Sequence, residues 1–267
     1  MSRLLFGAPA SPWPAFHAVN DTVRGGSSSS AWSVDQETLE ATFAGHLDIE
    51  TLGGAGFASQ STTFSPSRLS ISPATHAGLI LTFLVPPAPP SSSVSPARPH
   101  AFVLTLKNEQ PALRPDGRRE SVTSYEFEVD LDQYREDDDH PEVVSDEEKE
   151  IGQDEKGTAA GGRRVSVLAR WDEFTPTYRG RPQRDAKPLD PTRIYELGFM
   201  CRSNFARQAG DFCFRIVSLE AAAPGTKSGW VGWIARGWAA LGGWASGWAR
   251  AVSGWWKGES EGRVRLP

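Results

Sequence analysis

Apolar and polar residues alternate with the two-residue period of β-strands through much of the first 222 residues. The alternation is clearest in segment 124–131 (SYEFEVDL), which has one apolar face and one largely acidic face. The residues on its apolar face are Tyr125, Phe127, Val129 and Leu131. Segment 78–85 (GLILTFLV) is instead a continuous apolar run closed by two prolines, which is typical of a buried strand.

Further strands are expected in several segments, namely 39–52 with a turn at Gly45, 101–106, 164–171, 193–201 and 211–219. The residues expected to share an inward face in two of them are Val165, Val167 and Ala169, and Phe212, Phe214, Ile216 and Ser218. No segment before residue 224 has a sustained helical stripe. At least seven short strands joined by turn-rich loops predict an all-β fold, an antiparallel β-sandwich or jelly roll.

Two stretches interrupt this pattern between expected strands. Segment 86–99 is rich in proline and serine, and segment 135–162 has eleven acidic residues and one lysine between residues 136 and 155. Like-charge repulsion and low apolar content predict that the acidic stretch is a disordered insertion. We therefore expect a β-sandwich domain over residues 1–223 with two loop insertions, and a tail over residues 224–267.

The tail concentrates tryptophan between glycines. On a helix of about 100° per residue, its apolar residues fall within about 140° of arc, opposite Arg236, Arg250 and Lys257. They are Trp230, Trp233, Ile234, Trp238, Leu241, Trp244, Trp248, Val252, Trp255 and Trp256. Glycines weaken such a helix in water, so we expect an amphipathic helix that forms on a surface accepting indoles.

Three surfaces fit this expectation: a membrane interface, a groove on a partner protein, and the sandwich itself. A bilayer interface is favoured because indoles collect near headgroups and cations on the polar side. A membrane-spanning helix is disfavoured, since only thirteen uncharged residues separate Arg236 from Arg250 and a span needs about 20.

Five motifs occur in the order found in a known family. They are VNDTVRGGSSSSAW from Val19, GGAGFASQSTTF from Gly53, FTPTYRGRP from Phe174, PLDPTRIYELGF from Pro188 and QAGDFCFRIVSLEA from Gln208. Together they resemble the complex I intermediate-associated protein 30 family from about Phe16 to Ala221. The chain departs from the family pattern at Arg24, where methionine is usual, and at Ser61, where arginine is expected.

The resemblance implies a galactose-binding-like β-sandwich, and founding members of the family are mitochondrial assembly factors for respiratory complex I. Neither the acidic insertion nor the tryptophan tail is a feature of that family. The resemblance therefore predicts the fold more directly than it predicts a complex I role.

Two loops carry residues suited to binding. In the first, Asp21, Arg24, Gly25 and Gly26 form either a backbone-amide nest for an anion or a tight turn with both glycines at positive φ and Asp21 capping amides. In the second, Arg179 and Arg181 offer guanidinium groups to a phosphate or an acidic partner, or are solvated loop charges.

The sequence offers little for catalysis. Its five histidines have no metal-binding spacing, no nucleophile elbow occurs, and we expect neither a cofactor nor a metal. Nucleic-acid binding is not expected of an acidic chain without aromatic binding motifs on its strands. Cys201 and Cys213 are expected to be buried thiols rather than a disulfide.

These observations together predict a non-catalytic assembly or adaptor factor, with a chaperone-like role, whose partner is a membrane protein or membrane-associated complex. The N-terminus lacks the features of a cleaved leader, so we expect a peripheral position on the cytoplasmic face of an intracellular membrane, with the mitochondrion as the alternative. A lipid-headgroup or carbohydrate-binding module is a second hypothesis, and an enzyme with an unrecognised site is a third.

Overall fold

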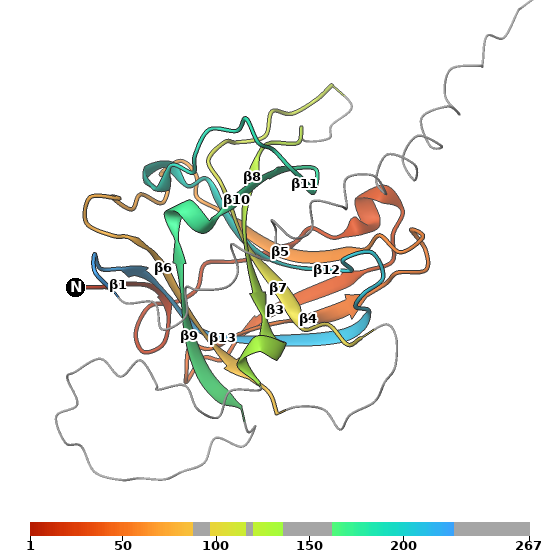
Figure 1. Cartoon of the computed structure of the whole chain (residues 1–267), viewed down its shortest axis with the longest axis horizontal. Helices are drawn as coiled ribbons and strands as arrows, with labels where there is room; N and C mark the ends of the chain where they lie inside the picture. The colour runs from red at the N-terminus through yellow and green to blue at the C-terminus, as the bar shows by residue number, and fades with distance from the viewer. Residues whose placement is uncertain (88–96, 116–119, 136–161, 227–267) are drawn as a thin grey trace, which may run out of the picture. The chain divides into compact units, whose positions relative to one another are not determined.

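The computed structural model describes residues 1–87, 97–115, 120–135 and 162–226 (Figure 1). The predicted amphipathic helix, with all its tryptophans, lies outside the described residues, as do most of the Pro/Ser stretch and of the acidic insertion. The described residues contain four short 3-10 helices: η1 (Asp21–Arg24), η2 (Leu131–Tyr134), η3 (Trp171–Glu173) and η4 (Pro191–Arg193). In this part of the chain, no helix has both the length and the apolarity needed to span a bilayer.

Within the described residues, six strands form one antiparallel sheet in the order β3-β4-β13-β6-β9, with β1 also paired to β13. Their bounds are β1 (Arg3–Gly7), β3 (Ser29–Val34), β4 (Ala41–Leu47), β6 (Gly78–Val85), β9 (Arg163–Arg170) and β13 (Gly210–Ala222). The long β13 pairs with β4 through its first half and with β1 near its end, so it is the central strand of this sheet.

Seven strands of the described residues form the second antiparallel sheet, in the order β11-β10-β8-β7-β12-β5-β2. Their bounds are β2 (His17–Ala18), β5 (Phe57–Thr63), β7 (Ala101–Lys107), β8 (Ser124–Asp130), β10 (Thr175–Tyr178), β11 (Arg181–Pro182) and β12 (Glu196–Arg202). Figure 1 shows β12, β5 and β7 of this sheet over β4 and β13 of the first.

The core lies between the two sheets and is rich in phenylalanine. Phe102 of β7 stacks on Phe214 of β13 with ring centroids 4.5 Å apart, and Phe43 of β4 meets Phe102 edge-on. All three side chains are almost completely buried. Because these contacts join one sheet to the other, the predicted all-β sandwich of antiparallel strands is confirmed.

Two details of the strand prediction are wrong. No turn occurs at Gly45, because β4 runs straight through it; a side chain there would collide with the carbonyl oxygen of Ser29 on β3, so the glycine permits close strand approach. In β13 the register shifts between Ile216 and Ser218, and Leu219 rather than Ser218 continues the apolar core.

Candidate functional site

The carboxylate of Asp21 ties the first predicted loop to the sandwich. Asp21 begins η1 and is completely buried. Its Oδ1 accepts a hydrogen bond from the backbone N–H of Ser28 (3.0 Å), and its Oδ2 accepts from Ser28 Oγ (2.6 Å) and from the Phe57 N–H (3.1 Å). Three donors of the chain itself therefore surround this carboxylate, which closes the loop against the start of β5.

The preceding asparagine extends this tie to both sheets. Asn20 Oδ1 accepts hydrogen bonds from Ser30 Oγ on β3 (2.7 Å) and from the Ser59 N–H on β5 (3.0 Å). Adjacent residues of one motif thus connect β3, the edge strand of one sheet, with β5 of the other.

The two glycines of the loop serve different purposes. Gly25 is in the left-handed region at φ 82° and caps η1 through a hydrogen bond from its N–H to the Thr22 carbonyl (3.0 Å). Gly26 is not left-handed, so the prediction of positive φ at both glycines is wrong for it. A side chain at Gly26 would lie 2.4 Å from the carboxyl carbon of Asp21, so the residue is small because the buried carboxylate needs that space.

The structure separates the two loops that the sequence suggested for binding. The Asp21 loop follows β2, at one edge of the seven-stranded sheet, whereas Arg179 precedes β11 and Arg181 begins it, at the opposite edge. Arg24 places its guanidinium 5.7 Å from the ring centroid of Phe57. Arg179 instead donates from Nε to Ser121 Oγ at 3.1 Å. The six residues therefore lie in two places.

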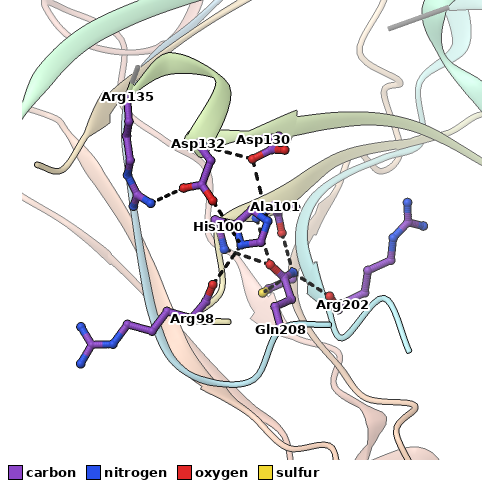
Figure 2. A network of polar contacts seen from close by, with 9 residues as sticks. Arg98, His100, Ala101, Asp130, Asp132, Arg135, Arg202 and Gln208 are labelled. Carbon is purple, nitrogen blue, oxygen red and sulfur yellow. Dashed lines mark hydrogen bonds and ion pairs between the residues drawn. The ribbon is translucent and has the colours of Figure 1, made fainter. Parts of the chain in front are cut away.

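A polar cluster that the sequence analysis did not single out lies where β7 begins and β8 ends (Figure 2). His100 precedes β7, Asp130 ends β8 and Asp132 lies in η2. His100 Nε2 is 4.0 Å from Asp130 Oδ1, and His100 Nδ1 is 3.8 Å from Asp132 Oδ2 and 3.0 Å from the carbonyl oxygen of Arg98. Figure 2 shows the imidazole between the two carboxylates and the Arg98 carbonyl.

A buried glutamine fixes the backbone at His100. Gln208 Oε1 accepts hydrogen bonds from the N–H groups of His100 (2.9 Å) and Ala101 (3.0 Å). Its Nε2 donates to the carbonyl oxygens of Ala101 (2.9 Å) and Arg202 (2.7 Å). Because Gln208 is 1% exposed, these bonds are shielded from water and hold the start of β7 firmly.

The turn that carries Gln208 is itself an unusual conformation. Asn204, Phe205 and Ala206 all have positive φ, at 47°, 61° and 61°. Side chains in this region cost about 1–2 kcal/mol each, so other contacts must hold the turn. Ser203 supplies them, donating from Oγ to the Gly54 carbonyl (2.8 Å) and accepting from the Gly56 N–H (3.0 Å).

Burial and neighbouring charges shift the pKa values of two groups in this region. Burial raises the pKa of Asp130, and the backbone hydrogen bond from Asp132 only partly opposes this. Burial alone would lower the pKa of Arg202, but Glu126 and Glu128 outweigh it, so that pKa is raised. The Arg202 guanidinium forms ion pairs with those two carboxylates at 2.7 and 2.8 Å, so its charge is compensated within the fold.

The two cysteines differ, which corrects the expectation that both are buried. Cys201 is fully buried on β12, and burial raises the pKa of its thiol far above the ordinary value. Cys213 is exposed, because it alternates with Phe212 and Phe214 along β13 and points away from the core.

Strand pairing, rather than spacing along the chain, would have revealed the histidine cluster. Ala101 is paired with Asp130 across β7 and β8, so His100 necessarily lies near the Asp-x-Asp sequence at 130–132. A search for histidines at fixed spacing cannot detect ligands brought together by neighbouring strands.

A comparison with known protein families identifies the family of this chain. The family model for complex I intermediate-associated protein 30 (CIA30) matches residues 5–82 and 124–216. The chain belongs to the CIA30 family. The CIA30 match includes the Asn20–Asp21 tie, Asp130, Asp132 and Gln208, whereas His100 lies between its two matched segments.

Similar proteins include an uncharacterized protein of Schizosaccharomyces pombe, 29% identical over 223 residues that cover 82% of this chain and 83% of that protein. Among solved structures, a family 11 carbohydrate-binding module from Clostridium thermocellum, in complex with a β-1,3-1,4-mixed-linked tetrasaccharide, has a TM-score of 0.43 and 7% identity. It covers 83% of this chain and 96% of the module. The family 11 module of a cellulosomal cellulase of the same organism has a TM-score of 0.42 and 9% identity, and the match covers 84% of this chain and 95% of that module.

Proposed function

We propose that this CIA30-family protein is a non-catalytic assembly or adaptor factor, a protein-binding β-sandwich that acts on a membrane complex. The observation that carries the proposal is the family match, which includes all or part of twelve of the thirteen strands in the described residues. The family is named for association with an intermediate of complex I, so the corresponding role here is to hold a partially assembled membrane complex.

The Asp21 loop is the surface that we assign to the partner. Val23 is 71% exposed in η1, next to Arg24, while Asp21 two residues earlier is completely buried. The loop thus exposes an apolar residue and a cation, and the hydrogen bonds of the buried Asp21 hold its backbone. Such preorganisation lowers the entropic cost of binding a protein surface.

The tryptophan tail is proposed to place this module at a membrane. Its sequence combines indoles on one helical face with cations on the other, which favours a bilayer interface. We propose a peripheral position on the cytoplasmic face of an intracellular membrane, with the mitochondrion as the alternative that the family name suggests.

The proposal is tested with the tagged full chain, crosslinked in cells and purified from membranes, with Val23→Asp beside the wild type. A charge at this position should reduce recovery of a specific membrane-complex subunit at least tenfold. Leu113→Asp is the matched control, because Leu113 is 72% exposed in a different loop and should have no effect. Thermal unfolding of each variant confirms that the fold is intact.

Three other outcomes would count against parts of the proposal. Equal loss in both variants, or in neither, removes the assignment of the Asp21 loop. Recovery of lipid or glycan instead of a protein subunit replaces the adaptor with a ligand-binding module. Unchanged membrane sedimentation after Trp244→Ser and Trp248→Ser removes the anchor.

A further inference from the structure

We propose that His100, Asp130 and Asp132 form a binding site for a divalent transition-metal ion, with zinc as the best match. One donor atom from each residue lies within 4.8 Å of the others. This site is independent of the adaptor role proposed above.

The distances within the cluster suit an ion better than direct bonding. His100 Nε2 is 4.0 Å from Asp130 Oδ1, and His100 Nδ1 is 3.8 Å from Asp132 Oδ2. Both distances exceed the range of a hydrogen bond. Zinc binds histidine nitrogen and carboxylate oxygen at about 2.0–2.2 Å, so two ligands on one ion are about 3–4 Å apart. An ion on Nε2 would meet Asp130 Oδ1 directly, whereas Asp132 Oδ2 faces Nδ1 and would join the ion after its side chain rotates toward Nε2.

The hydrogen-bond partner of Nδ1 indicates which ring nitrogen of His100 is available to an ion. Nδ1 is 3.0 Å from the Arg98 carbonyl oxygen, which can only accept, so Nδ1 carries a hydrogen. In the neutral imidazole, Nε2 then has a free lone pair on the side facing Asp130 Oδ1. Histidine ligands of metals are commonly held in this way by a carbonyl on the other ring nitrogen.

Each ligand is also held by a contact outside the cluster. Gln208 fixes the His100 backbone, and Arg135 pairs with Oδ1 of Asp132 while the other oxygen of that carboxylate faces His100. Asp130 Oδ1 caps η2 by accepting from the Asp132 N–H at 3.0 Å. Three donors are thus positioned before an ion arrives, which reduces the cost of ordering them.

The donor set and its access indicate the class of ion. One nitrogen and two carboxylate oxygens favour zinc, whereas calcium and magnesium prefer oxygen ligands alone. Two carboxylates with one nearby arginine leave a net negative charge that attracts a dication. The side chains of His100, Asp130 and Asp132 are 24%, 30% and 49% exposed, so an ion can enter from solvent.

The test is zinc titration of the chelator-treated full chain by competition with a chromogenic chelator. Excess magnesium is present to fill weak carboxylate sites, including those of the acidic insertion. We expect one zinc bound per chain, at least tenfold weaker binding in His100→Ala and in Asp130→Asn, and a zinc-dependent rise in melting temperature in the wild type that these two variants lack.

His46→Ala is the matched control, because His46 lies on β4, away from the His100 cluster, and its Nδ1 contacts Asp211 Oδ1 directly at 2.7 Å on the surface. It should bind zinc like the wild type. His100→Gln replaces His100→Ala if the latter fails to fold, and it should lose zinc binding as well. The absence of one-to-one binding in the wild type, or equal affinity in the His100 and His46 variants, overturns the proposal.

Discussion

Asp21 and Asp130 both stand at the start of a 3-10 helix, yet the chain surrounds them differently. Asp21 is completely buried and accepts from three donors of two segments. Asp130 is partly exposed, accepts from the Asp132 N–H and faces His100 across 4.0 Å. A carboxylate offers about four lone-pair positions, so the first is largely satisfied by the chain whereas the second retains capacity toward an outside ligand.

This difference separates a structural acid from a candidate ligand. Both belong to family-matched segments and both are aspartates at the start of a 3-10 helix, so residue type and local position do not distinguish them. The two aspartates are distinguished by the number of donors that each carboxylate accepts from, by burial, and by the distance to the nearest charged group. The predictions that follow test whether these geometric criteria correspond to measurable energies.

The largest effect is expected for Asp21→Asn. The amide keeps one acceptor, but its NH2 group must face Ser28 or the Phe57 N–H, so buried donors oppose each other. We expect the free energy of unfolding in urea to fall by about 3 kcal/mol. Asp211→Asn, whose side chain is 92% exposed, should change it by less than about 0.5 kcal/mol. Equal values for the two variants would refute a structural role for Asp21.

A smaller effect should distinguish the two glycines beside Asp21. Gly26→Ala places a methyl group 2.4 Å from the Asp21 carboxyl carbon and should cost about 2 kcal/mol or more. In Gly25→Ala the added methyl group has no atom within 4 Å, so the loss of stability comes from the positive φ alone and is about 1 kcal/mol. Melting temperatures should therefore fall further for Gly26→Ala. The reverse order would show that the backbone, rather than the space around the carboxylate, governs this loop.

The sequence predicted more of the fold than of the candidate sites. Alternation located β8, and a continuous apolar run located β6, because both strands contribute side chains to the phenylalanine core. It missed β3 and β5, whose serine-rich sequences lack an apolar period although they pair along their whole length. Here backbone pairing with neighbouring strands overrides side-chain pattern.

The candidate sites depend on pairing that sequence does not reveal. The Asp21 loop was identified with its two alternatives, and its carboxylate caps amides, as one of those alternatives expected. Its grouping with Arg179 and Arg181 ignored the sheet order, which places them at opposite edges. His100 was set aside because no histidine spacing matched a metal motif, whereas the structure reaches its partners across β7 and β8.

The smallest effect on stability is expected for Asp130→Asn in the presence of a chelator. The asparagine oxygen can still accept from the Asp132 N–H, so the cap of η2 survives and unfolding should change by less than about 1 kcal/mol. Zinc should then separate the two proteins, because an ion at 100 times its dissociation constant adds about 2.7 kcal/mol to the form that binds it. Urea unfolding with and without zinc measures both quantities on the same samples. A loss as large as that of Asp21→Asn without zinc would place Asp130 among the structural acids, and the contrast between the two regions would disappear.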